Sequence, residues 1–535
     1  MANIGDRAAT EWLLTQDERG NPCTTLDDVH PGQQAWSEGN LVRPLVHGST
    51  YFAELFERIE ATREGDLILF TDWQGDADQR LTAQPGSEVA EVLGRADERG
   101  VDVRGLVWRS HSKFFGLTAG ENRRLGQDLQ DRGAEALLDM RVRAGGSHHQ
   151  KLVVIRYRDD PTQDVAYVGG IDLCHSRRDD ADHLGDPQAL DTMADEYGDT
   201  PGWHDVQAAI RGPAVRDVET VFRERWEDPT PLSRSPIFFL QDRLRGLDLS
   251  PDPLPDQADP PPPVEGGTHA VQLLRTYPDL RLGRDYPFAN GGERSVARGY
   301  TKALERARRL IYLEDQYLWG IHVGDTFTEA LRAHPDLHVI AVLPLYPDLQ
   351  GAFKRTPQLL GRRRAMLEMR RAAPDRVALY GIENREGTPV YVHAKCCVVD
   401  DTWATIGSDN FNRRSWTHDS ELSAVVVDTD PEADREGGYA RRLRLTLAAE
   451  HLDRRPDEMD DCVDPVGMFT AYDESSWRLE EWYAGGRAGA RPPGRLRRLQ
   501  VPELGRLSRA WALLPYLTMH DPDGRPRSLR RRDEF

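Results

Sequence analysis

The sequence has 535 residues, which is more than one hydrophobic core usually supports, so we expect two domains or two similar halves. Charged residues make up 30% of the chain and the formal net charge is −20, a balance that argues against sequence-independent binding of nucleic acid and against general attraction to an anionic membrane. The five cysteines have no regular spacing and therefore predict neither a disulfide framework nor a zinc site.

Targeting signals are not evident in the sequence. Residues 1–22 lack the basic start and the apolar run of a secretory signal. The chain contains no run of about 18 apolar residues, so no transmembrane segment is expected. These features predict a cytoplasmic protein whose contact with membranes is at most peripheral.

Helices and strands alternate in the first part of the chain. Residues 51–59 carry apolar side chains near i, i+4 and i+7, which predicts a helix. Residues 66–73 form an apolar run that predicts a buried strand, and residues 88–99 and 101–108 repeat the helix and the strand. Strands that alternate with helices indicate an α/β architecture.

The same order returns later in the chain. A helix, a strand, a second helix and a second strand are expected at residues 296–309, 310–317, 327–333 and 337–345.

The spacing of these elements predicts an internal duplication. The first buried strand begins at Leu67, 82 residues before His149, and its counterpart begins at Leu310, 83 residues before His393. We therefore expect two similar halves related by a pseudo-two-fold axis. Each half would contain a mixed β-sheet flanked by helices, with one active site at the interface.

Each half contains a histidine and a lysine two positions apart, followed by an apolar strand. The pairs are His149 with Lys151 and His393 with Lys395. Alternation along a strand would direct both side chains of a pair to one face. Imidazole can act as nucleophile, acid or base near neutral pH, and lysine supplies positive charge for phosphate oxygens. Two facing pairs would make a phosphodiester site that needs no metal ion.

These stretches resemble the paired HxKxxxxD motifs of the phospholipase D superfamily. The first copy departs from the pattern, because Arg156 stands where the family has Asp and Asp172 stands where it has the trailing Asn. Asp159, Asp160 or Asp164 would have to replace the motif aspartate. The second copy matches at His393, Lys395, Asp400, Gly407, Ser408 and Asn410.

The resemblance is closest in detail to plant-type phospholipases D. Residues 203–205, which read Trp-His-Asp, and residues 313–317 are similar to segments of those enzymes. The similarity begins near residue 45, so the amino-terminal lipid-binding domain of the eukaryotic enzymes is not expected. Domain boundaries follow from the resemblance and from the Pro-rich linker: an extension (1–44), a first half (45–250), the linker (251–267), a second half (268–450) and a carboxy-terminal extension (451–535).

The resemblance also implies a role for each matching residue. His149 would attack phosphorus to form a phosphohistidine, and His393 would protonate the leaving alcohol and then activate the second nucleophile. The residues alone do not decide which histidine attacks, and the family pattern favours the first. Lys151, Lys395 and Asn410 would stabilise charge on the phosphoryl group.

A carboxylate is needed to orient each imidazole, and the resemblance suggests Asp205 for His149 and Glu421 for His393. Gly170, Asp172, Asp400 and Ser408 are expected at the site in substrate-binding or structural roles. No metal site and no cofactor are predicted. Residues 179–182 are interpreted as a solvated acidic loop, and His148, His175 and His204 as residues of the site wall.

The resemblance implies a phospholipase D that releases phosphatidic acid and a head-group alcohol from a glycerophospholipid, first of all phosphatidylcholine. An alcohol that replaces water would give head-group exchange. The alternatives are a cardiolipin synthase-like enzyme or a nuclease with the same site, or an inactive scaffold that binds lipid or phosphate. The expected partner is phospholipid at a membrane or micelle surface, and a monomer is expected because one chain holds both motifs.

Overall fold

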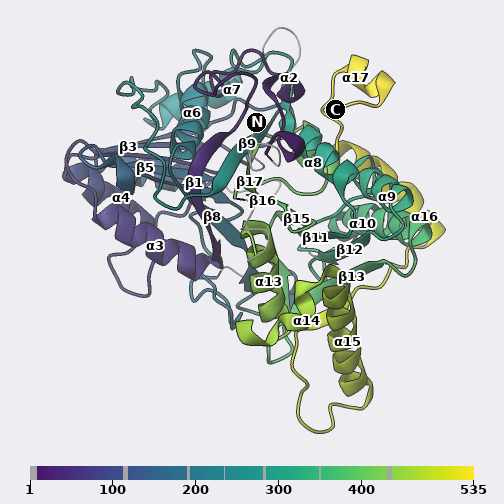
Figure 1. Ribbon diagram of the computed structural model, residues 1–535. Helices are drawn as coiled ribbons and strands as arrows, with labels where there is room; N and C mark the ends of the chain where they lie inside the picture. Colours follow the sequence, from purple (N-terminus) through teal and green to yellow (C-terminus); the bar gives the residue numbers. More distant parts are fainter. Residues whose placement is uncertain are drawn as a thin grey trace.

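The computed structural model describes residues 9–111, 119–189, 193–233, 235–280, 285–348, 351–430 and 437–535. Two mixed β-sheets, one in each half of the chain, form its centre. In Figure 1 the first half, with β3, β5, α3 and α4, lies at the left, and the second half, with β11–β13, α9 and α10, lies at the right.

The first sheet combines a parallel part and an antiparallel part. β2, β3 and β4 are parallel, and β5, β6, β8 and β1 continue the sheet in antiparallel order. The order across this sheet is β4 (Glu135–Asp139), β3 (Asp102–Trp108), β2 (Leu67–Asp72), β5 (Leu152–Arg156), β6 (Val165–Gly169), β8 (Val206–Arg211) and β1 (Ser37–Val46).

The second sheet has the same order and the same directions. β11, β12 and β13 are parallel, and β15, β16, β17 and β9 continue in antiparallel order. Across this sheet the strands are β13 (Val377–Glu383), β12 (His338–Val342), β11 (Leu310–Glu314), β15 (Cys396–Val399), β16 (Trp403–Gly407), β17 (Glu421–Asp428) and β9 (His269–Tyr277). The predicted duplication is therefore confirmed strand by strand.

Two strand pairs join the halves. β1 pairs with β9, with Ser37 opposite Val271, and this strand crosses the boundary that the sequence predicted at residue 45. β7 (Gly202–His204) leaves the first half and pairs with β14 (Pro389–Val392) in the second. The remaining short strands are β10 (Glu293–Arg294) and β18 (Leu496–Arg498).

Helices cover the outer face of each sheet. The outer helices of the first half are α3 (Gly48–Glu60), α4 (Val89–Glu98) and α5 (Glu121–Gln130), and those of the second are α8 (Ser295–Arg306), α9 (Val323–Ala333) and α10 (Ala352–Ala372). Between the sheets lie α6 (Ala214–Trp226) and α13 (Tyr439–His451). The other helices are α2 (Gln16–Arg19), α7 (Pro236–Leu244), α11 (Arg413–Thr417), α14 (Asp460–Val463), α15 (Pro465–Ala484), α16 (Arg506–Pro515) and α17 (Arg527–Arg532).

Both faces of each sheet are buried, which explains the continuous apolar runs in the sequence. In β2, Leu67 and Leu69 pack into the core between the sheets, whereas Ile68 and Phe70 pack against the outer helices. This alternation follows from the two-residue period of a strand. The core between the sheets therefore fixes the distance between the halves.

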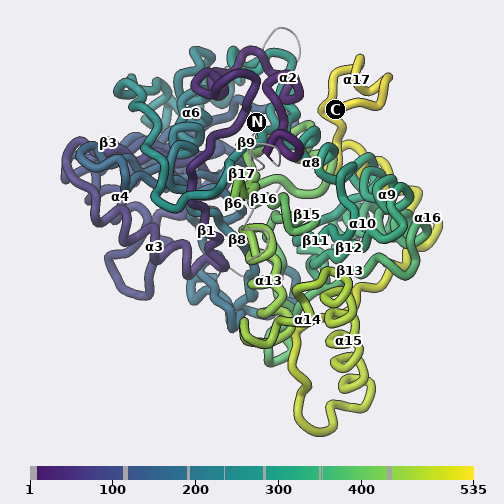
Figure 2. The backbone as a smooth tube through the Cα atoms, viewed as in Figure 1, coloured from purple at the N-terminus to yellow at the C-terminus, as the bar shows by residue number. Residues whose placement is uncertain are grey.

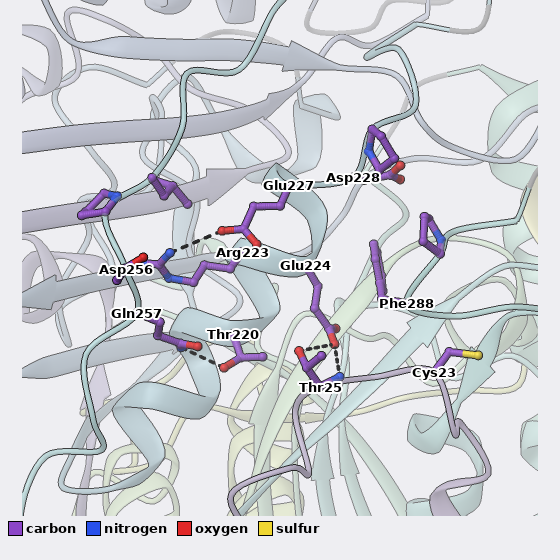
Figure 3. Close-up of a pocket in the computed structure, with 14 residues that line it drawn as sticks. Cys23, Thr25, Thr220, Arg223, Glu224, Glu227, Asp228, Asp256, Gln257 and Phe288 are labelled. Carbon is purple, nitrogen blue, oxygen red and sulfur yellow. Dashed lines mark hydrogen bonds and ion pairs between the residues drawn. The ribbon is translucent and has the colours of Figure 1, made fainter.

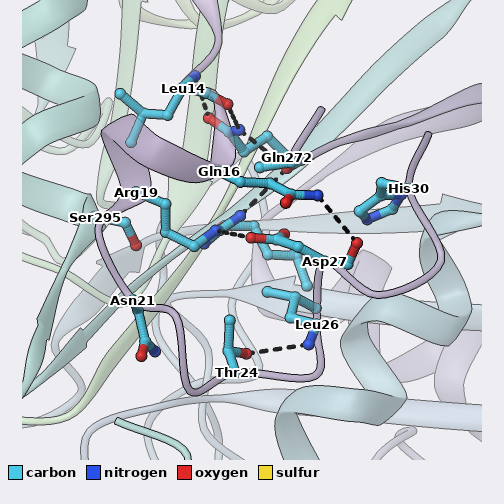
Figure 4. A network of polar contacts seen from close by, with 12 residues as sticks. Leu14, Gln16, Arg19, Asn21, Thr24, Leu26, Asp27, His30, Gln272 and Ser295 are labelled. Carbon is cyan, nitrogen blue, oxygen red and sulfur yellow. Dashed lines mark hydrogen bonds and ion pairs between the residues drawn. The ribbon is translucent and has the colours of Figure 1, made fainter. Parts of the chain in front are cut away.

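The amino-terminal segment packs on the second half, beside α8 and across β9 (Figure 2). Figure 4 shows the contacts: Leu14 and Gln272 hydrogen-bond to each other, and Arg19 forms a 2.8 Å ion pair with Asp27. Arg19 also donates to the carbonyl oxygen of Leu273. These buried contacts tie the predicted extension to the second sheet.

A surface depression lies between α6, the Pro-rich linker and the amino-terminal segment (Figure 3). Thr220 and Gln257 face each other across it at 2.9 Å, and Glu224 accepts a hydrogen bond from the backbone N–H of Thr25. None of the histidines or lysines of the two motifs lines it. The depression is therefore separate from the predicted site.

Candidate active site

The two motifs lie at the entrances of corresponding strands. His149 and Lys151 directly precede β5, and His393 and Lys395 occupy the link between β14 and β15. The prediction placed these residues within the strands, and the structure places them in the extended residues just before them. Each pair still acts as a unit, since each lysine ammonium donates a hydrogen bond to the backbone carbonyl of its own histidine.

Each histidine is oriented by a carboxylate from the opposite half. His149 Nδ1 lies 2.8 Å from Glu421 Oε2, and His393 Nδ1 lies 2.6 Å from Asp205 Oδ2. The sequence predicted the reverse pairing, Asp205 with His149 and Glu421 with His393, and that prediction is wrong. Both carboxylates are nevertheless at the site.

Backbone pairing between the halves explains why the pairs cross. The N–H of His393 donates to the carbonyl of His204, where β7 pairs with β14 and brings Asp205 beside the second motif. On the symmetric side, the N–H of His149 donates to the carbonyl of Ser420, next to Glu421. The crossing therefore follows from the pseudo-two-fold arrangement, in which each motif strand lies beside a segment of the other half.

Electrostatics couple the two motifs. Burial lowers the pKa of His149 well below its usual value, and the charges of Lys151 and Lys395 lower it further. Burial likewise lowers the pKa of His393, with Lys395 contributing. Burial and the nearby Lys151 outweigh the Asp205 carboxylate and lower the pKa of Lys395 to about 7. Groups of one motif thus act on groups of the other, as expected for a single site.

The two orienting carboxyl groups differ in protonation. Burial alone would raise the pKa of Asp205, but His393 and Lys395 beside it lower it to about 2. Burial raises the pKa of Glu421 to about 8, and the neighbouring Asp419 carboxylate adds to this shift. At neutral pH Asp205 is ionised, whereas Glu421 retains a proton within its pair with His149.

The residues that follow each motif support these carboxylates in different ways. Ser408 donates a 2.6 Å hydrogen bond to Glu421. Gly170 holds the corresponding position in the first half, where a Cβ atom would lie 2.2 Å from an oxygen of Asp205. Glycine is therefore required because the carboxylate occupies the space of its side chain.

Asp172 and Asn410 occupy equivalent positions beyond these residues. Asp172 accepts backbone hydrogen bonds from Trp73 and Gln74 and lies 3.5 Å from the Lys151 ammonium. Asn410 is buried, and its side-chain oxygen has no hydrogen-bond partner among the described residues. Both predicted residues are thus at the site. Asp172 Oδ1 has partners, whereas the side-chain amide oxygen of Asn410 has none among the described residues.

Asp400 and Arg156 occupy the same place in the two sheets. Asp400 lies opposite Leu310 and accepts the backbone N–H groups of Arg309 and Leu310, so it fixes the start of β11. Arg156 lies opposite Leu67, at the start of β2, and pairs instead with Asp164 at 3.0 Å. Neither side chain contacts the motif histidines.

Two tryptophans that were not predicted as site residues lie beside the histidines. The ring centroids of Trp73 and His149 are 6.1 Å apart, and those of Trp203 and His393 are 4.8 Å apart. Arg177 stacks over Trp203 at 3.8 Å. The sequence could have indicated Trp203, because it stands two residues before Asp205 and alternation along an extended strand puts both side chains on one face.

The interpretation of the acidic loop holds for Asp180 and Asp182, which are exposed, but it is wrong for Asp179, and the interpretation of His204 is wrong. Asp179 is buried rather than solvated, and its carboxylate contacts His183 at 3.0 Å and accepts the N–H of Trp203. His204 is also fully buried, with Nε2 2.5 Å from Glu314. Both residues belong to a cluster behind the active site and not to its wall.

Two family profiles match this chain. A family profile described as "Phospholipase D" matches residues 65–342, and one described as "Cardiolipin synthase, PLD-like domain" matches residues 354–436. In the part of the chain that the structure describes, no helix combines the length and the hydrophobicity that crossing a bilayer requires.

Curated relatives share low identity over much of this chain. Phospholipase D zeta 2 of Arabidopsis thaliana is 22% identical over 88% of this chain and 59% of its own length. Phospholipase D1 of Schizosaccharomyces pombe is 27% identical over 59% of this chain and 28% of its own length. Phospholipase D alpha 2 of Oryza sativa subsp. japonica is 25% identical over 85% and 70%. The chain thus spans less than two thirds of the first two relatives.

A solved structure supports the fold alone. The crystal structure of phosphatidylserine synthase from Haemophilus influenzae Rd KW20 has a TM-score of 0.50 and 14% identity, and the match covers 81% of this chain and 89% of that one.

Proposed function

The chain belongs to the phospholipase D family, whose profile matches more than half of it, and we propose that it hydrolyses the head-group phosphodiester of a glycerophospholipid. The crossed histidine–carboxylate pairs carry this proposal. Two imidazoles, each oriented by a buried carboxylate, face a site that contains two lysines. This is the set of groups that a two-step displacement at phosphorus requires.

In the first step, His149 Nε2 attacks phosphorus and the bond from phosphorus to the head-group oxygen breaks. In the reactive form Glu421 has lost its proton, and the Nδ1–H of His149 donates a hydrogen bond to the Glu421 carboxylate, which leaves Nε2 free to attack. The leaving oxygen takes a proton from His393, whose charged form the Asp205 carboxylate stabilises. We assign the attack to His149, whose side chain is 15% exposed compared with 7% for His393.

In the second step, water gives a proton to His393 and attacks phosphorus, and the bond from phosphorus to His149 breaks. The products are phosphatidic acid and the free head-group alcohol. A primary alcohol that replaces water would give the exchanged phospholipid. Lys151 and Lys395 bind the non-bridging oxygens through both steps, because their positive charges match the charge of the phosphoryl group.

Phosphatidylcholine is the substrate that we propose to test first. Purified protein is incubated with phosphatidylcholine vesicles, with and without ethanol, and free choline and lipid products are measured. We expect choline release, phosphatidic acid in water and phosphatidylethanol when ethanol is present. His149→Ala should abolish all three, whereas His334→Ala, on a surface histidine at the end of α9, should change none.

Trapping of the covalent intermediate tests the assignment of the histidines. The His393→Ala enzyme should accumulate a phosphorylated histidine from a substrate with a good leaving group, because it lacks the base for the second step. The His149→Ala enzyme should accumulate none. Accumulation in His149→Ala alone would exchange the two roles. Absence of any lipid turnover by the wild-type enzyme would overturn the proposed substrate.

A further inference from the structure

A buried histidine cluster lies directly behind the active site. It consists of His47, His183, His204 and Glu450, with one nitrogen or oxygen atom of each within 4.8 Å of the others. His47 precedes α3, His183 lies in the loop before β7, His204 ends β7 and Glu450 lies near the end of α13. The four residues are far apart in the sequence. Figure 1 shows α13, which carries Glu450, between the two halves.

Three imidazole nitrogens are aimed at one carboxylate. The Nε2 atoms of His47 and His183 lie 2.7 and 3.0 Å from Glu450, and Nδ1 of His204 lies 3.4 Å from it. Ligands of a tetrahedral zinc ion at its usual bond lengths are about 3.3 Å apart. The donor set and its spacing therefore resemble those of a four-coordinate metal site.

The outer nitrogens of two of these histidines are also held by carboxylates. His183 Nδ1 lies 3.0 Å from Asp179, and His204 Nε2 lies 2.5 Å from Glu314. Glu314 is held in turn by Tyr312 and by His451. Histidines that bind metal ions typically donate their second ring N–H to a carboxylate in this way, which fixes the ring and its tautomer.

Without a metal ion, this arrangement of histidines and carboxylates places charged groups in a buried site, which costs free energy. His183 has a carboxylate 3.0 Å from each ring nitrogen, so without a metal ion either His183 carries a full positive charge or a neighbouring carboxyl group is protonated in a buried site. His204 Nδ1, 3.4 Å from Glu450, has no hydrogen-bond partner among the described residues. A divalent cation supplies positive charge for the carboxylates and a partner for this nitrogen with both histidines neutral. Each histidine then binds the ion through one nitrogen and donates the proton of the other.

We propose that His47, His183, His204 and Glu450 bind a divalent transition-metal ion, for which zinc is the best match to three imidazoles and one carboxylate. All four ligands come from the protein, which is typical of a structural site. The ion would connect the first half, through three histidines, to α13 of the second half. The Glu450 side chain is 11% exposed and offers a route for the ion to enter.

The cluster is linked through the backbone to the His393–Asp205 pair of the active site. The carbonyl of His204 accepts the N–H of His393, and Asp205 is the next residue in the chain. The N–H of His47 donates to the carbonyl of Asp205. A metal ion bound to His47 and His204 would therefore fix the backbone on both sides of the carboxylate that orients His393.

Metal analysis of the full-length, untagged protein tests the proposal. The protein is produced with zinc, iron and manganese in the medium, dialysed, and analysed by mass spectrometry of the elements. We expect about one zinc ion per chain, which His47→Ala and Glu450→Gln each abolish. Asp179→Asn should weaken zinc binding about 10–100-fold, and the surface control His334→Ala should leave it unchanged.

Two readouts on the wild-type chain serve if a variant fails to fold. A strong chelator should lower the melting temperature and added zinc should restore it. Cobalt(II) added to the chelated protein should give the visible absorption of a tetrahedral site. A wild-type protein that contains no transition metal, takes up none and melts at the same temperature with chelator would overturn the proposal. Equal metal content in His47→Ala would assign the ion to another place.

Discussion

At the scale of single residues, the crossed pairs make the two carboxylates unequal partners in catalysis. Glu421 contacts the proposed nucleophile, His149, and Asp205 contacts the proposed acid, His393. A good leaving group such as p-nitrophenol needs little help from an acid, whereas choline needs it. The leaving group can therefore separate the two contributions.

Asp205→Asn should lower choline release by about 10²–10⁴-fold but should lower p-nitrophenol release from the matching phosphodiester much less. Glu421→Gln should lower both to a similar extent, because it impairs the attack itself. Pre-steady-state rates of the first release of choline or p-nitrophenol give the measurement, because they report the first step before the second step, which also needs His393, limits turnover. If Glu421→Gln alone spares the p-nitrophenol substrate, then His149 is the acid and the proposed roles are reversed.

The pH dependence of kcat/KM follows from two groups in the free enzyme. The pKa of Glu421 is raised to about 8, so its pair with His149 loses the proton that blocks attack as the pH rises through that value. The pKa of Lys395 is lowered to about 7, so its positive charge is already being lost as the pH rises through that value. We expect a narrow bell with its maximum between these values.

Lys395→Arg tests the falling limb of this profile, because a guanidinium group stays charged throughout the range. The variant should lose the decline at high pH and keep the rise at low pH, whatever its absolute rate. Measurement of kcat/KM from pH 5 to about 10 decides the matter. An unchanged falling limb would mean that another group than Lys395 sets it.

At the scale of elements, Arg156 replaces the motif aspartate of the first half and makes structural contacts of its own. Its side chain is 8% exposed, forms ion pairs with Asp164 and Glu219, and donates to the carbonyl of Asp259 in the linker. It thus connects β5 to α6 and to the Pro-rich segment. Strand register places it exactly opposite the first residue of β2, as Asp400 is placed in the second sheet.

Arg156→Ala should destabilise the protein by about 3–5 kcal/mol, because it leaves the buried Asp164 carboxylate without its arginine and leaves Glu219 with Arg223 alone. Turnover of the folded fraction should stay close to that of the wild type. Arg43→Ala, which removes a pair whose arginine is 51% exposed, should cost only about 0–1 kcal/mol. Urea unfolding gives the stability and choline release gives the turnover. A stable Arg156→Ala protein without activity would contradict this structural role.

The sequence predicts local and repeated features well. Helix periodicity and buried runs gave α3, β2, α4 and β3 within a few residues, and the matched spacing gave the duplication. It could not predict which carboxylate meets which histidine, because that depends on pairing between β7 and β14 and between His148 and Ser420. Chain order suggests the nearer partner, whereas the pseudo-two-fold axis selects the farther one.

The histidine cluster was missed for a related reason. Metal sites are recognised in a sequence by close spacing of their ligands, and here the four residues stand at 47, 183, 204 and 450. The acidic run at residues 179–182 was visible but was interpreted as solvated, since nothing in the sequence shows that Asp179 contacts His183. Only the assembled fold reveals this set.

At the scale of the whole molecule, the halves hold one another together without the linker. β1 pairs with β9, β7 pairs with β14, and each catalytic pair contains one residue from each half. The residues Glu265 and Gly266 are exposed and precede β9, so a protease site inserted between them would cut the chain without cutting an element. The core between the sheets is shared by both fragments.

Cleavage at that inserted site should leave one particle with nearly full activity, because the contacts that build the site do not pass through the linker. Gel filtration in native buffer should show the elution volume of the intact chain, and choline release should persist. Fragments separated in urea should each be inactive after refolding alone, since each lacks an orienting carboxylate, and should recover activity when refolded together. Activity in either isolated fragment would show that one motif suffices, and separation in native buffer would show that the linker holds the halves together.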